Sequence, residues 1–553
     1  MLVALPTELL IKVLALLPWQ TLLLVKRVAR ILNVLITETV LLTYIVELGS
    51  SSMVDGPSGR FTTADRLVKL RRLREGWKAP EEASRTAITF TQVITAYDLQ
   101  KGVLTIGHGN DETWTTLSLR YYRLDSRVNE VVSENWCFIG LGEGARDYTT
   151  DPAQDLVVLL EEFDARDPSL CRFHLRTMST GTPHPLAKAP VLRGRTKYLT
   201  RDVEGRFDYF LVLRGKLLAC GCTLTSEDQG EISTNLWIWD WPSGALVFTL
   251  DSKLHASFTF LDDQSFALAI NDSAYHQTND WWIDVYFIRQ GSATPARFML
   301  PRFRPGEIIT VTGMMLRSDP NDSSIQVQEY AHTGKQEGSH RRAFHASPDE
   351  RILLLSCDVS HQGRLNSQAP GIISRLFSIA IRGSALRSIA EDQLKSGNLE
   401  SDSSCKGLSW EHWGPSSTRW VRRWTRNGFV NDVHSQRCIV DAEGPGNERA
   451  LSVMDFNPYI LRQDTSGPSA SPMDTWEFGD RVQTRLVNQS TCIALPYIFK
   501  EPIVSSLPYE ETFYPIEGEL GFGECAFCLD EERILLFKNL LDASPTTCTI
   551  LTM

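Results

Sequence analysis

Two cysteine pairs are the places in this 553-residue chain where residue type and spacing come nearest to metal chemistry. They are Cys220-Gly-Cys222 and Cys525-Ala-Phe-Cys528. A structural zinc site needs four ligands, and neither pair has a second pair or a histidine close to it in the sequence. We therefore favour buried cysteines on strands over zinc ligands.

Motifs for catalysis or cofactor binding are missing from the chain. Gly140-Leu-Gly142-Glu-Gly144 has the glycines of a dinucleotide-binding loop, but their spacing is wrong and no strand–helix–strand pattern surrounds them, so we interpret it as a simple loop. There is no Gly-x-Ser-x-Gly elbow, His-Glu-x-x-His helix or Gly-x-x-x-x-Gly-Lys loop, and the eleven histidines are scattered. The sequence predicts no catalytic, cofactor-binding or metal-ligating residue, no cofactor and no enzyme. A site assembled from distant segments would leave no such motif.

Composition restricts the partners and the compartment. A formal net charge of -11 argues against a nucleic-acid-binding surface over the whole protein. Lys12, Pro18 and Lys26 interrupt the apolar N-terminal stretch, and a membrane span needs about 20 apolar residues in a row. The N-terminus lacks the basic residues of a secretory signal, and the cysteine spacing indicates reduced thiols. We expect a cytoplasmic and/or nuclear chain that binds neither membrane nor nucleic acid.

The first 36 residues have the apolar spacing of three short helices. Thr7 is a candidate N-cap with Glu8 in the first turn, and Pro18 ends the first helix. A second helix is predicted to begin near Thr21, and a third carries Val28. A segment of roughly 40 to 50 residues or fewer seldom buries enough surface to fold alone. We therefore expect a partner, in the same chain or another, to cover these side chains.

One ordered pattern in this segment resembles the F-box, the three-helix module that inserts into the Skp adaptor of cullin-RING ubiquitin ligases. It is Leu5-Pro6-x-Glu8-Leu9-Leu10-x-x-Val13-Leu14-x-x-Leu17-Pro18-x-x-x-Leu22-x-x-Val25-x-x-Val28-x-Arg30. Ala29 stands where the family usually has serine, and Leu32 where it has tryptophan. The alternative is a helical hairpin packed on its own domain. The resemblance implies that twelve residues bind the adaptor, and through it a cullin: Leu5, Pro6, Glu8, Leu9, Leu10, Val13, Leu14, Leu17, Pro18, Leu22, Val25 and Val28.

An amphipathic helix is predicted after this module. Leu67, Leu70, Leu73 and Trp77 fall on one stripe, and the arginines and lysines between them predict a solvated basic face. Residues 50–59 are rich in serine, glycine and proline and are predicted to form a flexible joint before the helix. We expect an F-box domain at 1–48, a linker with this helix at 49–86 and a β domain at 87–553.

Short β-type runs alternate with turn residues throughout the β domain. The stretch 235–250, in which Asp240-Trp-Pro-Ser-Gly244 separates two apolar runs, resembles the third and fourth strands of a WD-repeat propeller blade. Weaker forms end at Gly102, Gly181, Gly291 and Gly383. Acidic turns before apolar strands, at 151–160, 261–270, 347–355 and 529–537, are expected at blade beginnings. The resemblance implies a propeller of about seven blades, with six or eight also open; one or two β-sandwiches are the alternative.

Two further features of the β domain could serve recognition. Polar insertions at 225–234, 396–406 and 463–474 nominate a binding surface, because propeller loops lie on the faces where partners bind. The stretch 410–424 holds four tryptophans with arginines, a composition typical of interface hot spots, but alternate positions on a strand also bury tryptophan. We favour the structural role for these tryptophans.

The resemblances together predict a multidomain α+β protein with a small helical F-box, a linker helix and a large all-β propeller. Its implied function is the substrate-recognition subunit of an SCF-type ubiquitin ligase, which binds a protein substrate through the propeller and performs no bond chemistry. Two alternatives stay open. One is a propeller scaffold without a degradative role, and the other is a propeller hydrolase or lectin with an incidental helical N-terminus.

Overall fold

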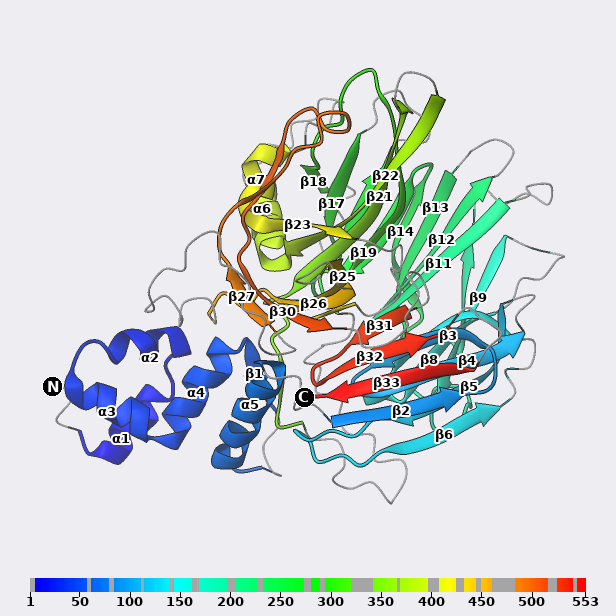
Figure 1. Ribbon diagram of the computed structural model, residues 1–553. Helices are drawn as coiled ribbons and strands as arrows, with labels where there is room; N and C mark the ends of the chain where they lie inside the picture. The colour runs from blue at the N-terminus through cyan, green and yellow to red at the C-terminus, as the bar shows by residue number, and fades with distance from the viewer. Residues whose placement is uncertain are drawn as a thin grey trace.

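The computed structural model shows a helical N-terminal region attached to a larger β region (Figure 1). It describes residues 5–553 except for 57–60, 79–83, 111–113, 140, 142–143, 162–166, 168, 197–204, 227–231, 273–279, 289–293, 320–341, 366–368, 396–406, 424–431, 444–448, 460–482, 516–524 and 541–544. The predicted combination of a small helical region with a mostly β remainder is confirmed.

Four helices share one small apolar core, which we call the helical core. It consists of Leu10, Leu14, Leu22, Leu32, Ile36 and Leu42, all at most 6% exposed. Among the described residues no single helix is long and apolar enough to span a membrane; α3 and α4 reach the length only together, across an 84° bend. The four helices are α1 (Thr7–Leu14), α2 (Trp19–Val25), α3 (Arg30–Glu38) and α4 (Val40–Ser50).

Prolines, rather than threonines, precede the first two helices. Pro6 is the N-cap of α1, and its carbonyl accepts two backbone N–H bonds of 3.0 Å. Pro18 is the N-cap of α2. Thr7 lies inside α1 and is not its N-cap, so that prediction is wrong; α2 begins near Thr21, as predicted, but Thr21 lies inside it. Proline suits this place because its φ is already fixed near the helical value and its missing N–H costs no bond there.

The last helices of the N-terminal part pack into the β region. Strand β1 (Met53–Asp55) pairs antiparallel with β20 (Phe344–Ala346), so the predicted flexible joint contains a paired strand. Helix α5 (Thr63–Lys78) has the predicted apolar stripe, and the four residues of that stripe are buried. We call the shared cluster the junction core; it joins Tyr44 and Leu48 of α4 and Leu67, Leu70, Leu73 and Trp77 of α5 to Phe344, Ile439, Val453, Tyr514, Phe527 and Ile534 of the β region.

Antiparallel sheets of mostly consecutive strands make up the β region. An eight-stranded sheet contains two meanders, β3 to β6 and β7 to β10, joined by the single pair Thr116–Ala145. Four-stranded sheets follow with the orders β11-β12-β13-β14, β15-β16-β17-β18 and β19-β21-β22-β23, then a five-stranded sheet, β24-β25-β26-β30-β27, a small pair, β28-β29, and the sheet β31-β32-β33-β2.

The strand bounds are as follows. They are β2 (Ser84–Phe90), β3 (Ile94–Gln100), β4 (Val103–Asn110), β5 (Thr115–Arg123), β6 (Glu134–Ile139), β7 (Ala145–Asp151), β8 (Leu156–Glu161), β9 (Leu170–Thr177), β10 (Val191–Arg195), β11 (Gly205–Arg214), β12 (Leu217–Ser226), β13 (Ile232–Asp240), β14 (Ala245–Ser252), β15 (His255–Phe260), β16 (Ser265–Asn271) and β17 (Trp281–Phe287). The rest are β18 (Ala296–Met299), β19 (Ile308–Arg317), β21 (Ile352–Leu365), β22 (Ala369–Arg382), β23 (Thr418–Arg423), β24 (Val433–His434), β25 (Arg437–Glu443), β26 (Arg449–Asp455), β27 (Gln483–Val487), β28 (Thr491–Ile493), β29 (Ile503–Ser505), β30 (Tyr509–Pro515), β31 (Cys525–Leu529), β32 (Arg533–Lys538) and β33 (Thr546–Thr552).

Each sheet or meander of four or more strands packs between two others, and the last packs against the first. Second strands such as β8 and β16 are apolar runs buried on both faces for this reason. Between the β7–β10 and β11–β14 sheets, Phe173 and Trp239 lie 5.4 Å apart between ring centroids. Tyr97 of β3 stacks on Phe537 of β32 at 4.8 Å, which joins the first sheet to the last. The sheets therefore form a closed ring, the arrangement of a β-propeller, in which β2 completes the sheet of the C-terminal strands.

The turn motifs predicted from the sequence have mixed outcomes. Asp240 pairs with Ala245 across the predicted turn, and β13 and β14 are the third and fourth strands of their sheet. Gly102 also ends a hairpin turn, with a φ of +76°. This turn joins β3 to β4, the first and second strands of their meander, rather than a third strand to a fourth. Gly383 starts a helix instead, and Gly291 lies outside the described residues. All four acidic turns come just before the second strand of a sheet or meander, so their expected place at blade beginnings is wrong, although the place is the same in each.

Two helices pack on the ring beside β18 and β23 (Figure 1). They are α6 (Gly383–Lys395) and α7 (Trp410–Ser417). Trp410 and Trp413 of α7 and Trp420 of β23 are buried in a shared cluster, which agrees with the structural interpretation of the tryptophans. Trp410 and Trp413 lie on a helix rather than a strand, however, and Trp424 is outside the described residues.

Candidate functional site

The candidate site is the apolar surface of α1 to α3. Helix α1 has two apolar faces, because Leu10 and Leu14 lie one turn apart on one side and Leu9 and Val13 lie one turn apart on another. The first pair enters the helical core, while Leu9 is 49% and Val13 39% exposed. Leu16 continues this exposure at 85%. A helix of two turns cannot bury both faces in so small a core.

The twelve predicted adaptor-binding residues divide into three groups. Leu5, Pro6, Glu8, Leu9, Val13, Pro18 and Val28 are exposed, and Leu17 and Val25 are half-buried against the helical core. Leu10, Leu14 and Leu22 are at most 3% exposed, so in this structure they hold the helices together rather than face a partner. The cover expected for these side chains therefore comes in part from the same chain, beyond the first 36 residues. The core forms because α4 adds Leu42 to it.

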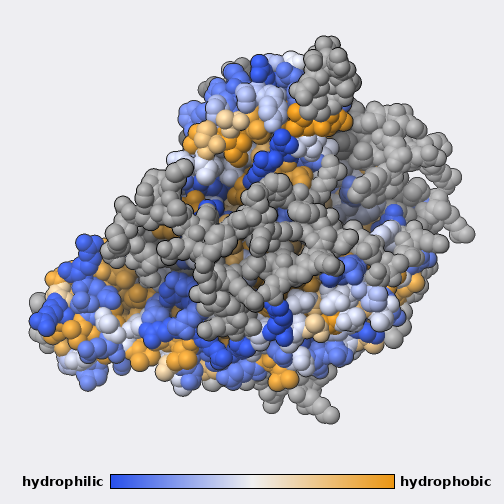
Figure 2. Space-filling model, viewed as in Figure 1, coloured by the Kyte–Doolittle hydropathy of each residue, from blue (hydrophilic) through white to orange (hydrophobic). Residues whose placement is uncertain are grey.

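Exposed apolar residues beyond those twelve enlarge this surface. Leu24 on α2 is 63% exposed, Ile31 on α3 is 55% and Val34 is 44%. Helical spacing from Leu9 could have found Leu16, but the faces of α2 and α3 depend on how the helices pack. Figure 2 shows hydrophobic and polar residues mixed on the surface of this region, which lies on the left in the view. We call Leu9, Val13, Leu16, Leu24, Val28 and Ile31 the open apolar surface.

The open apolar surface has basic neighbours. Lys12 follows it on α1, Arg27 comes after α2, and Arg30 is the first residue of α3; all three are exposed. Glu8 and Glu38 are the exposed acids of the same helices. The arrangement suits a partner that has an apolar centre and acidic flanks.

Polar contacts fix the junction between the helical core and the β region. Arg66 of α5 is buried, pairs with Asp55 of β1, and donates to the carbonyls of Gly56 at 2.9 Å and Ala343 at 3.1 Å. Its burial departs from the predicted solvated basic face. The hydroxyl of Tyr44 donates to Asp55 at 2.6 Å, and burial together with Asp55 raises the pKa of Tyr44.

Further contacts lie on either side of this junction. The indole N–H of Trp77 donates to the Glu531 carbonyl at 3.0 Å, and the Arg437 guanidinium lies over the Trp77 ring at 4.7 Å. Trp19 of α2 meets Tyr459 of the β region edge to face at 4.4 Å between centroids. The helices are therefore held at several separate points.

Other sequence candidates do not assemble into a reactive site. Cys220, Cys222 and Cys528 are buried on strands as favoured, and burial raises the pKa of Cys220 and Cys528 well above the ordinary thiol value. His174 pairs with Glu161 and His361 with Glu307, on separate sheets. Within the described ranges no cluster of histidine, cysteine and carboxylate residues could hold a metal ion.

The nominated loops fall largely outside the described residues. Residues 396–406 and 463–474 are wholly outside them, and so is 227–231 of the first insertion. The glycine-rich stretch is described only at Leu141 and Gly144, which lie between strands β6 and β7 rather than at the start of a helix.

Comparison with known proteins gives only distant likenesses. No protein-family model matches the chain, and no curated protein does. Similar solved structures include the WD40 domain of SCAP from fission yeast, at TM-score 0.34 and 6% identity, covering 85% of this chain and 98% of that one. An uncharacterized protein from Listeria monocytogenes EGD-e gives 0.25 and 9%, covering 67% and 91%. Pyrococcus horikoshii acylaminoacyl peptidase gives 0.28 and 8%, covering 75% and 57%. Because these TM-scores are low, the description of the fold rests on strand order and packing.

Proposed function

We propose that the chain is the substrate-recognition subunit of an SCF-type ubiquitin ligase. Its open apolar surface binds a Skp-type adaptor and through it a cullin, and its β region, a seven-bladed propeller, binds a protein substrate. The division proposed is 1–48 for adaptor binding, 49–86 for the connection and 87–553 for the substrate. The protein acts in the cytoplasm and/or nucleus by bringing a substrate close to a charged conjugating enzyme and is not itself an enzyme.

The observation that carries the proposal is an apolar surface left open beside a core that is already complete. Leu16, Leu24 and Val28 are 85%, 63% and 76% exposed, although Leu10, Leu14 and Leu22 show that these helices can bury leucine. Exposed apolar side chains that gather on three short helices favour a protein-binding site. The F-box resemblance, which includes Leu9, Val13 and Val28 of this surface, names the adaptor as the partner.

The fixed junction also supports the proposal. A ligase subunit gains from holding its two partners at a constant separation, because proximity is what it contributes. Arg66, Trp77 and the pairing of β1 with β20 restrict movement between the adaptor-binding helices and the substrate-binding ring.

Binding to a purified Skp-type adaptor tests the proposal. The Leu9→Glu/Val28→Glu variant is expected to lose binding about 100-fold or more, because burying each such side chain contributes about 1.5–3 kcal/mol and 1.4 kcal/mol is tenfold in Kd. The matched control is Leu246→Glu/Ile308→Glu, whose residues are similarly exposed, at 51% and 63%, on β14 and β19. Equal adaptor binding by wild type and the first variant would overturn the assignment.

Cullin separates the ligase from the non-degradative scaffold. The full chain with its adaptor is expected to co-purify a cullin in stoichiometric amount. Adaptor binding without any cullin would replace the ligase proposal by the scaffold.

A further inference from the structure

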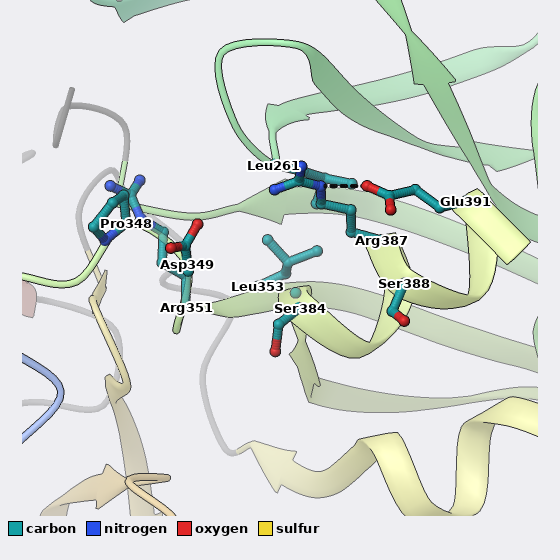
Figure 3. A pocket seen from close by; sticks show the side chains of 10 residues that line it. Leu261, Pro348, Asp349, Arg351, Leu353, Ser384, Arg387, Ser388 and Glu391 are labelled. Atoms are coloured by element: carbon teal, nitrogen blue, oxygen red, sulfur yellow. Dashed lines mark hydrogen bonds and ion pairs between the residues drawn. The ribbon is translucent and has the colours of Figure 1, made fainter. Parts of the chain in front are cut away.

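A cavity of about 290 Å³ lies between helix α6 and two of the acidic turns of the ring (Figure 3). The turn before β16 contributes Leu261, and the turn before β21 contributes Pro348 and Asp349. Leu261 and Leu353 form an apolar lining and are 7% and 1% exposed. Since a water molecule occupies about 30 Å³, the space can hold a side chain of medium size.

Two carboxylates, of Asp349 and Glu391, and two arginines, Arg351 and Arg387, border this space. Arg387 of α6 is held in place, with Nη1 2.7 Å from Asp262 Oδ2 and Nε 3.0 Å from Glu391 Oε1. Asp349 is exposed, and no other described residue forms a hydrogen bond or ion pair with its carboxylate. Figure 3 shows the Asp349 carboxylate and the Arg387 guanidinium bordering the same space, with Leu353 beside them.

We infer that this cavity binds the carboxamide side chain of a glutamine or asparagine in a protein partner. A carboxamide has an NH₂ group that donates to Asp349 and a carbonyl that accepts from Arg387, while its methylene groups contact Leu261 and Leu353. An anionic side chain meets the like charges of Asp349 and Glu391, and a cationic side chain meets those of Arg351 and Arg387. The chemistry of the border therefore selects a neutral group with both functions.

Strands β16 and β21, which follow the two turns, belong to the region proposed to bind the substrate. The inference therefore rests on the proposed function and deepens it by naming a side chain in the substrate. It needs no adaptor. Its test therefore uses the full chain alone, and the two proposals can fail separately.

Saturation-transfer difference NMR on the full-length protein tests the inference with three probes: N-acetyl-glutamine methylamide, N-acetyl-glutamate methylamide and N-acetyl-lysine methylamide. The glutamine probe is expected to receive at least three times the saturation of the other two. Asp349→Ala is expected to lower it to their level; because Asp349 is exposed and has no partner among the described residues, this variant keeps the fold.

The control Glu501→Gln changes an exposed acid away from the cavity and is expected to leave the signal unchanged. Equal signals from all three probes would overturn the inference, and so would a stronger signal from glutamate or lysine. An unchanged glutamine signal in Asp349→Ala would also overturn it.

Discussion

The helical N-terminus and the β ring differ in how completely they bury their apolar side chains. Of the 24 large apolar side chains exposed among the described residues, eleven lie between Leu5 and Leu41, and thirteen are spread over the rest of the chain. The ring seals each sheet between two neighbours, so its second strands are buried on both faces. The helices have one small core and leave their other faces open. The ring therefore buries its own apolar surface, and the helices carry the open apolar surface that we propose for the partner.

The largest expected effect comes from the helical core, where Leu22 is buried and its neighbour Leu24 is 63% exposed. Leu22→Ala is expected to destabilise the helices by about 2–5 kcal/mol, because it leaves a cavity in a core of few residues. Leu24→Ala is the matched control, with an expected change within about 0.5 kcal/mol. Hydrogen exchange of α1 to α4 measures both. Similar exchange in the two variants would mean that the two faces of α2 do not differ as described.

A smaller effect is expected at the junction between the two regions. Arg66→Met removes the donors to the Gly56 and Ala343 carbonyls and the partner of Asp55, at a cost of about 1–3 kcal/mol. Urea unfolding followed by tryptophan fluorescence measures the loss. Arg72→Met, at an exposed position of the same helix, is the control. If both variants unfolded at the same urea concentration, Arg66 would not be part of what holds the regions together.

The smallest effect is expected in the ring, at Asp147 of β7. Burial is the main cause that raises the pKa of Asp147 to about 7, and the nearby Asp98 carboxylate adds to it. Since the unfolded value is near 3.8, this group's contribution to stability is fully present below about pH 4 and is lost as the pH rises through 7. Asp147 is only half-buried, which makes the effect modest.

The carboxamide introduced by Asp147→Asn is neutral at every pH. Thermal unfolding is therefore expected to show a higher Tm than wild type at pH 8, with a difference that shrinks at pH 5. The exposed Glu501→Gln is the control and is expected to show no such trend. A wild type that gains stability between pH 5 and 8 relative to Asp147→Asn would contradict the assignment.

Local patterns in the sequence predicted the elements that local chemistry determines. The stripe of Leu67, Leu70, Leu73 and Trp77 forms the predicted helix, and the Pro-Ser-Gly turn after Trp241 forms the predicted hairpin. Each depends on neighbours within a few positions. The alternation of strands and turns predicted a mostly β ring for the same reason.

Side-chain direction in the candidate site could not be predicted in the same way. Both faces of α1 are apolar, and the packing of α2, α3 and α4 decides that Leu10 is buried while Leu9 is open. Burial of Arg66 depends on the carbonyl of Ala343, 277 positions away. Trp410 and Trp413 fit a strand as well as a helix by composition. These features depend on contacts between distant segments, which one sequence does not specify.

Hydrogen exchange of the full chain with and without a saturating Skp-type adaptor tests the central claim, that the open apolar surface of α1 to α3 is the adaptor site. We predict new protection in α1, α2 and α3 and unchanged exchange throughout the β ring. Protection that falls on the ring, or a chain whose exchange the adaptor does not alter, would contradict the claim.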